Sequence, residues 1–152
     1  MDATEERPRT TAIGLLTDAK DMLLAASILH DSDKEWKVQG PTYYLLGHAT
    51  ELALKSFLLA NGDSLDRLRQ RIGHNLAKAA RRVRATKCDP LAQTVADNFE
   101  VIELLNFYYE AKEFEYRVTG LKSYPKKELL FEFLRTAIPM IEPHAMRVYP
   151  GR

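Results

Sequence analysis

Three titratable side chains, His48, Glu51 and Lys55, share one face of an otherwise apolar helical segment. At about 100° per residue, both neighbours fall within roughly 60° of Glu51. Apolar residues cover most other directions: Leu46, Ala49, Leu52, Ala53, Leu54, Phe57, Leu58 and Leu59. A helix this apolar is expected to be buried, and buried charges are rare unless they are paired. The pattern therefore predicts either an internal ion-pair network or a chemical site.

The spacing favours a network, because a Glu four residues before a Lys is well placed for a helix ion pair. We therefore interpret His48, Glu51 and Lys55 as structural and expect Tyr116 to reach the same region. A metal site is the weaker interpretation. A helical di-metal site needs paired Glu-x-x-His elements and further carboxylates, whereas this chain has one reversed copy. No metal or cofactor is expected.

A second set of residues, Arg69, Arg71, His74 and Asn75, lies where a new helix is expected to begin. Unpaired backbone N–H groups at a helix start favour anions, and the two arginines would add positive charge. This combination predicts phosphate binding. In the alternative interpretation, Arg69 is a solvated loop cation and His74 caps the helix.

A basic stripe, Lys78, Arg81 and Arg82, follows on one face of that helix, within about 100° of arc. It is either a solvated surface or the footprint of a nucleic acid or acidic partner. Few aromatic residues lie near it, so sequence-specific reading of bases is not expected there.

Five helices are predicted to position these residues. Capping residues, prolines and three-to-four spacing of apolar residues set their bounds. They run from Thr10 or Thr11 to near Asp31, from Pro41 to Asn61, from His74 or Asn75 through Val83, from Asp89 to Gly120, and through Leu130 to a kink or end near Pro139 and Pro143. Residues 63–73 are expected to be a connection with about one helical turn.

The pattern indicates an all-α, up-and-down bundle in a single domain spanning residues 1–152. Its core is expected at about 10–142, with flexible tails at 1–9 and 144–152. No apolar run approaches the roughly 20 residues that a membrane span needs, and the N-terminus lacks an apolar signal core. The single Cys88 excludes an internal disulfide. Because no histidine lies near it in the sequence, its thiol is not expected to be activated. A soluble, cytoplasmic protein is expected.

Three short motifs resemble those of the HEPN family, small helical domains of prokaryotic defence and toxin systems. The first is YYLLGHATELALKSFLLANG, the second is GHNL at residues 73–76, and the third is LNFYYEAKEFEYR, which includes Tyr116 and Arg117. The resemblance covers Ile13 to about Ile141. It implies a five-helix domain that cleaves RNA or binds nucleotides.

Active members of that family carry an Arg followed four to six residues later by a His, a spacing that Arg69 and His74 fit. Such a pair could cleave RNA without a metal, with His74 moving a proton and Arg69 holding the phosphate. In active members the motif usually lies later in the chain, where Arg117 has no His within six residues. We include Arg117 among the candidate binding residues. We therefore expect a non-catalytic module that binds nucleotide, RNA or a protein partner. The alternative is a metal-independent endoribonuclease that uses Arg69 and His74.

Five aromatic residues in the expected fourth helix exceed what one buried stripe can accommodate: Phe107, Tyr108, Tyr109, Phe114 and Tyr116. Most soluble oligomers are two-fold symmetric, so we expect a homodimer that uses part of this helix. The resemblance further implies a cognate antitoxin or a nucleotidyltransferase as a partner.

Overall fold

The computed structural model describes residues 9–115 and 120–148, and within them the regular structure is entirely helical. The elements are α1 (Ala12–His30), the short 3₁₀ helix η1 (Glu35–Lys37), α2 (Gln39–Ala60), α3 (Leu65–Arg71), α4 (Leu76–Ala85), α5 (Leu91–Asp97), α6 (Phe99–Glu110) and α7 (Lys127–Arg147). The all-α prediction is confirmed, but the described residues form seven α-helices where five were expected.

The two additional helices have local causes. The expected connection at 63–73 contains α3, whose N-cap Ser64 accepts a hydrogen bond from the Arg67 amide. The expected helix from Asp89 to Gly120 is divided at Asn98, whose side chain donates to the carbonyl of Thr94 and competes with the backbone. It also ends early, at Glu110.

The last helix is longer than expected. Proline removes a backbone donor, yet α7 continues through Pro139 and Pro143 to Arg147. Ile141 and Ala145 are fully buried in this stretch. Their burial against the core offsets the missing hydrogen bonds, so packing overrides the local preference to stop.

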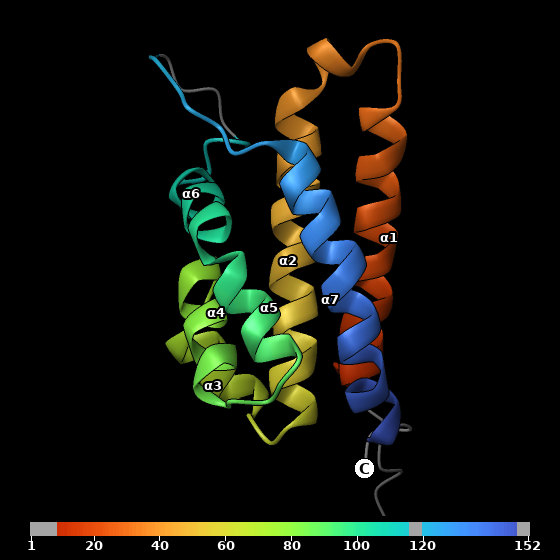
Figure 1. Ribbon diagram of the computed structural model, residues 1–152, viewed down its shortest axis with the longest axis vertical. Coiled ribbons are helices and arrows are strands. Elements are labelled where there is room, and N and C mark those ends of the chain that lie inside the picture. The colour runs from red at the N-terminus through yellow and green to blue at the C-terminus, as the bar shows by residue number, and fades with distance from the viewer. Residues whose placement is uncertain (1–8, 116–119, 149–152) are drawn as a thin grey trace, which may run out of the picture.

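The three long helices, α1, α2 and α7, lie side by side, while α3 to α6 form a second group along α2 (Figure 1). The neighbours α2 and α7 run in the same direction, opposite to α1, so the arrangement is not purely up-and-down. This follows because α3 to α6 carry the chain back along the molecule before α7 begins.

The apolar helix α2 occupies the centre, in contact with α1, α7, α4 and α6. Its side chains Leu46, Leu54 and Phe57 are buried with Leu16 of α1 and Phe133 of α7. Burial of a large apolar side chain contributes about 1.5–3 kcal/mol, so this junction of helices fixes the fold around α2.

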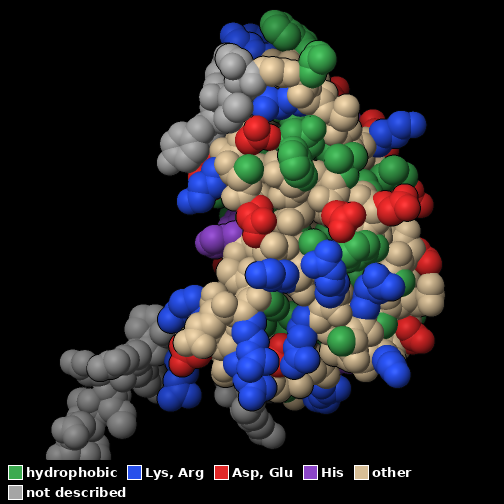
Figure 2. All heavy atoms as spheres, turned by 90° about the vertical axis from the view of Figure 1, so that its left-hand side faces the viewer, with side chains coloured by type: hydrophobic (Ala, Val, Ile, Leu, Met, Phe, Trp, Pro, Cys, Tyr) green, Lys and Arg blue, Asp and Glu red, His purple; other side chains and the backbone are tan. Residues whose placement is uncertain are grey.

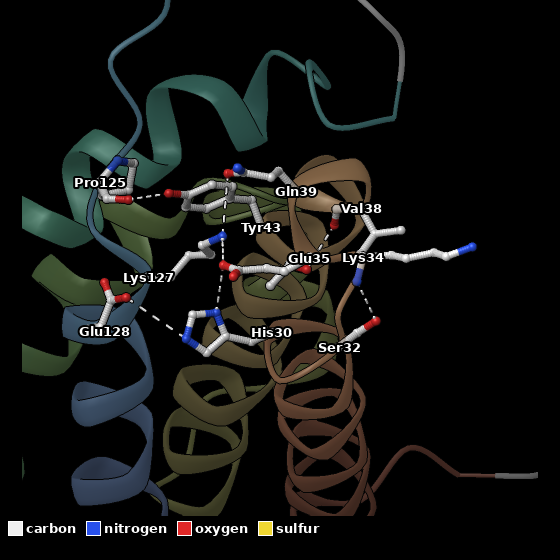
Figure 3. Close-up of polar contacts among 11 residues, drawn as sticks. His30, Ser32, Lys34, Glu35, Val38, Gln39, Tyr43, Pro125, Lys127 and Glu128 are labelled. Atoms are coloured by element: carbon white, nitrogen blue, oxygen red, sulfur yellow. Dashed lines mark hydrogen bonds and ion pairs between the residues drawn. The ribbon is translucent and has the colours of Figure 1, made fainter.

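A half-buried ion pair joins η1 to the start of α7 (Figure 3). Lys127 donates to the Glu35 carboxylate, and its Nζ lies 5.6 Å from the centre of the Tyr43 ring. The hydrogen bond from Lys127 holds the pKa of Glu35 below its usual value. His30 Nδ1 approaches Glu35 Oε1 at 3.0 Å from the end of α1. The cluster fixes the loop that connects α1 to α2.

None of the helices in the described part of the chain combines the length and apolar character needed to cross a membrane.

Candidate functional site: a histidine held by a buried carboxylate

Glu51 is at the centre of a polar cluster formed by residues from separate parts of the chain. Its side chain is almost fully enclosed, with a relative exposure of 3%. Lys55 donates to Oε2 at 2.8 Å and Tyr109 of α6 donates to Oε1 at 2.7 Å. His74, in the turn before α4, places Nδ1 3.1 Å from both carboxylate oxygens. Three donors therefore compensate one buried charge.

These contacts keep Glu51 ionised. Burial by itself disfavours the carboxylate and would raise its pKa. The hydrogen bonds from Lys55 and Tyr109, the positive charge of Lys55 and the hydrogen bond from His74 outweigh burial and lower the pKa of Glu51 below 4.5. The cluster is therefore built around a stable carboxylate.

Tyr109 extends the cluster to His48. Burial and the adjacent Glu51 charge raise the pKa of Tyr109, so its hydroxyl stays protonated and donates to Glu51. Since that single proton is used, the hydroxyl accepts from Nδ1 of His48, 3.3 Å away. Gly47 makes room for the Tyr109 ring, because a Cβ at that position would lie only 2.7 Å from its Cε1 atom.

His74 combines this anchor with access to solvent. Its side chain is 71% exposed although its Nδ1 contacts the buried carboxylate. Donation from Nδ1–H to Glu51 fixes the tautomer and leaves Nε2 as the outward nitrogen. Gly73 supplies the turn, with a φ of 56° that other residues adopt reluctantly. The backbone and Glu51 together hold the imidazole in a defined orientation.

The start of α4 is already occupied by hydrogen bonds within the protein. The side chain of Asn75 accepts from the Lys78 amide at 2.9 Å, as expected of an N-cap. The buried amide of Asn106 accepts from the Leu76 backbone at 2.7 Å and also donates to Asn75. The backbone N–H groups of Leu76 and Lys78 are therefore already hydrogen-bonded within the protein. The sequence had suggested that such groups could bind an anion, so the helix start contributes little to phosphate binding.

A hollow of about 410 Å³ opens beside His74, between α2 and α3. Glu51, Lys55, Arg69 and His74 line it, with apolar walls from Leu15, Leu52, Leu65 and Leu68. The side chain of Arg69 is strongly exposed and lies 3.6 Å from Asp66, a pairing that solvent weakens. The structure thus brings Arg69 and His74 to one hollow together with the Glu51 and Lys55 pair.

The remaining predicted binding residues lie outside this hollow. Lys78, Arg81 and Arg82 are exposed on α4, and Figure 2 shows lysines and arginines gathered in the lower part of the face formed by α3 to α6, with acidic side chains above them. Arg82 makes two hydrogen bonds to Asp63, at 2.8 and 3.1 Å, and Arg81 lies 3.5 Å from Glu103. The basic stripe is therefore partly neutralised. Arg71 is exposed at the end of α3.

Sequence reasoning placed Tyr116 in the network and Arg117 in the binding set, and both lie outside the described residues. It missed Tyr109, which contacts Glu51 directly. The available signal was Gly47, since a glycine inside an apolar helix often marks a close approach by another group.

Among the described residues, no group of three or more His, Cys, Asp or Glu side chains is arranged to hold a metal ion.

Comparisons of the chain with protein-family models, with curated proteins and with solved structures find no match.

Proposed function

We propose that this protein is an HEPN-like helical module that binds the phosphate of a nucleotide or RNA in the hollow beside His74. One observation carries the proposal: an exposed imidazole, held by buried Glu51, lines the same hollow as Lys55 and Arg69. Charged hydrogen-bond donors around one concave surface are the usual means of binding a phosphate.

The charges of the hollow favour an anion. Three donors compensate the Glu51 carboxylate, whereas the ion pair that Arg69 makes within the described part of the chain is the weak contact with Asp66. A phosphate near Nε2 would favour the protonated imidazole, which then donates from both ring nitrogens. Glu51 would stabilise that imidazolium from one side and the phosphate would stabilise it from the other.

The family resemblance supports the same position. The run from Glu51 to Lys55 and the turn from Gly73 to Leu76 are two of the motifs that resemble HEPN proteins. Residues from both motifs line this hollow, although they are far apart in the sequence.

A second candidate function is metal-independent RNA cleavage, favoured by the contact between Glu51 and His74. A carboxylate that fixes the Nδ1–H tautomer leaves Nε2 able to accept a proton from a ribose 2′-hydroxyl. Arg69 would stabilise the charge that develops on the phosphate. We rank this second, because the chain has the Arg and His pair at an earlier position than active family members do.

Binding is tested with a fluorescent single-stranded RNA of mixed sequence and fluorescence anisotropy. We expect His74→Gln and Arg69→Ala each to weaken binding about tenfold, as loss of a charged hydrogen bond implies. Arg135→Ala removes an exposed arginine from α7 and serves as the matched control. Affinity should fall steeply with salt, and equal affinity at low and high salt would contradict phosphate binding.

Cleavage is tested by incubating the same RNA with each variant in EDTA. We expect no cleavage by the unmodified protein. Cleavage that His74→Gln abolishes and Arg135→Ala retains would overturn this ranking in favour of the ribonuclease.

The proposal also covers the location of the protein, its oligomeric state and its partner. We place it in the cytoplasm, as a homodimer formed through α6, with an antitoxin or a nucleotidyltransferase as its cognate partner. Two apolar side chains on α6 support the dimer, since Phe107 is 69% exposed and Leu104 is 40% exposed.

A further inference from the structure

A second hollow, of about 250 Å³, lies on the other side of His74. The aromatic residues Tyr44, His48 and Tyr109 line it, and the charged residues Glu110, Lys112 and Glu115 complete its lining with His74. His74 lines both hollows and separates the proposed phosphate site from this aromatic one.

The aromatic wall consists of two nearly parallel rings and a third ring that is tilted by 34° to Tyr44. Tyr44 and His48 are one helical turn apart on α2, and their rings stack with centroids 5.9 Å apart and planes 13° from parallel. The Tyr44 and Tyr109 rings lie 6.2 Å apart. Tyr109 is fixed by Glu51 and in turn orients His48. A rigid aromatic surface beside an aqueous hollow is suited to stacking a nucleic-acid base.

We propose that this second hollow is the base subsite of the nucleotide whose phosphate occupies the first hollow, and that it prefers guanine. The inference rests on the proposed function, because it places the two ends of one ligand on either side of His74. Tyr44 and His48 supply the stacking surface, and Glu110 and Glu115 supply the preference.

The preference follows from hydrogen-bond chemistry. An ionised carboxylate only accepts, and its two oxygens match two adjacent donors. The pairing edge of guanine offers such donors on N1 and N2, whereas uracil offers one. Lys112 also lines the hollow but can only donate, so Glu110 and Glu115 are the charged lining residues that can accept from N1 and N2. They discriminate between these two bases, whereas stacking alone would tolerate both.

The test is isothermal titration calorimetry of the full chain with three probes: guanosine 5′-monophosphate, uridine 5′-monophosphate and ribose 5-phosphate. We expect affinity to fall in that order, with the guanine nucleotide binding about tenfold more tightly than the sugar phosphate, as stacking of one base implies. Tyr44→Leu should weaken the binding of both nucleotides, because one stacking ring is lost, and should leave the binding of ribose 5-phosphate unchanged.

A double variant, Glu110→Gln with Glu115→Gln, should make the two nucleotides bind alike. Circular dichroism at increasing temperature establishes that each variant is folded. The comparison of probes on the unmodified protein needs no variant, so a Tyr44→Leu protein that fails to fold does not prevent the test.

The outcomes separate the two proposals. If none of the three probes binds, the proposed phosphate site is wrong and the base subsite falls with it. If ribose 5-phosphate binds and the guanine nucleotide binds no more tightly, the phosphate site stands and the base subsite is overturned. An unchanged guanine affinity in folded Tyr44→Leu overturns it as well.

Discussion

Glu51 is the residue on which the site depends, because it joins α2 to α6 and to the turn before α4. Lys55 is a local partner four residues away, while Tyr109 and His74 come from distant parts of the sequence. The buried charge of Glu51 is tolerated because these three partners compensate it. Removing the carboxylate would leave buried Tyr109 and half-buried Lys55 without their acceptor.

The first prediction concerns stability. We expect Glu51→Ala to lower the free energy of unfolding by about 3–5 kcal/mol, the usual cost of leaving the partner of a buried ion pair uncompensated. Urea denaturation measures the change. Glu103→Ala is the control, because its carboxylate is exposed and its pair with Arg81 should contribute at most about 1 kcal/mol. An unchanged stability in Glu51→Ala, together with lost RNA binding, would instead assign Glu51 to the ligand site alone.

The second prediction concerns the stability of the protein at low pH. The pKa of Glu51 is lower in the folded protein than its usual 4.5, so the unfolded chain takes up the proton first as pH falls. The stability due to Glu51 is therefore complete above about pH 4.5 and is lost as the pH falls through the lower folded value. Urea denaturation between pH 7 and pH 3 should show this loss. Glu51→Gln should be less stable at neutral pH and should lose less stability in acid; equal acid slopes would contradict the assignment.

At the scale of elements, α2 has two roles: it is the central apolar helix and it carries half of the polar cluster. Gly47 reconciles them, because it lets the Tyr109 ring of α6 approach the backbone of α2. From this position the Tyr109 hydroxyl donates a hydrogen bond to Glu51, which lies one turn further along α2.

The third prediction follows from this contact. In a free helix, replacing Gly with Ala favours helix formation by about 0.5–1 kcal/mol. We expect Gly47→Ala to destabilise the protein instead, by about 1–3 kcal/mol, because its Cβ would overlap the Tyr109 ring. Thermal denaturation measures the change. Gly40→Ala is the matched control in the same helix, since its nearest neighbouring atom would lie 4.0 Å away. A Gly47→Ala protein more stable than the unmodified one would refute the close contact.

At the scale of the molecule, the second group of helices supplies partners that the long helices lack. Helices α1, α2 and α7 pack as one group, and α3 to α6 bring Arg69, His74 and Tyr109 to the polar face of α2 (Figure 1). The same group exposes Phe107 and Leu104 on α6. An apolar surface of this kind is typical of an interface.

The fourth prediction therefore concerns assembly. We expect a homodimer at micromolar concentration in light scattering coupled to size exclusion. Phe107→Glu should give a monomer, because a charge in an apolar two-fold interface meets its own copy. Leu24→Glu places the same charge on an exposed apolar position of α1 and should leave the dimer intact. A monomeric unmodified protein would refute the interface on α6.

Features that depend on neighbours within one or two helical turns could be predicted from the sequence. The buried apolar face of α2 and the pairing of Glu51 with Lys55 are local, and the two N-caps were each predicted to within one residue, Thr10 or Thr11 and His74 or Asn75. Such features follow from helical geometry, because residues three or four apart must lie on one face.

Which distant residues share the site depends on how the helices pack against one another. His74 reaches Glu51 across 23 residues and Tyr109 reaches it across 58, and no local spacing encodes either contact. The same holds for Cys88, whose Sγ lies 3.9 Å from Nε2 of His144 although no histidine is near it in the sequence. Packing also extended α7 through two prolines, where Ile141 and Ala145 are buried. These outcomes depend on which helix faces meet and how much apolar surface they bury, and that is a property of the whole chain.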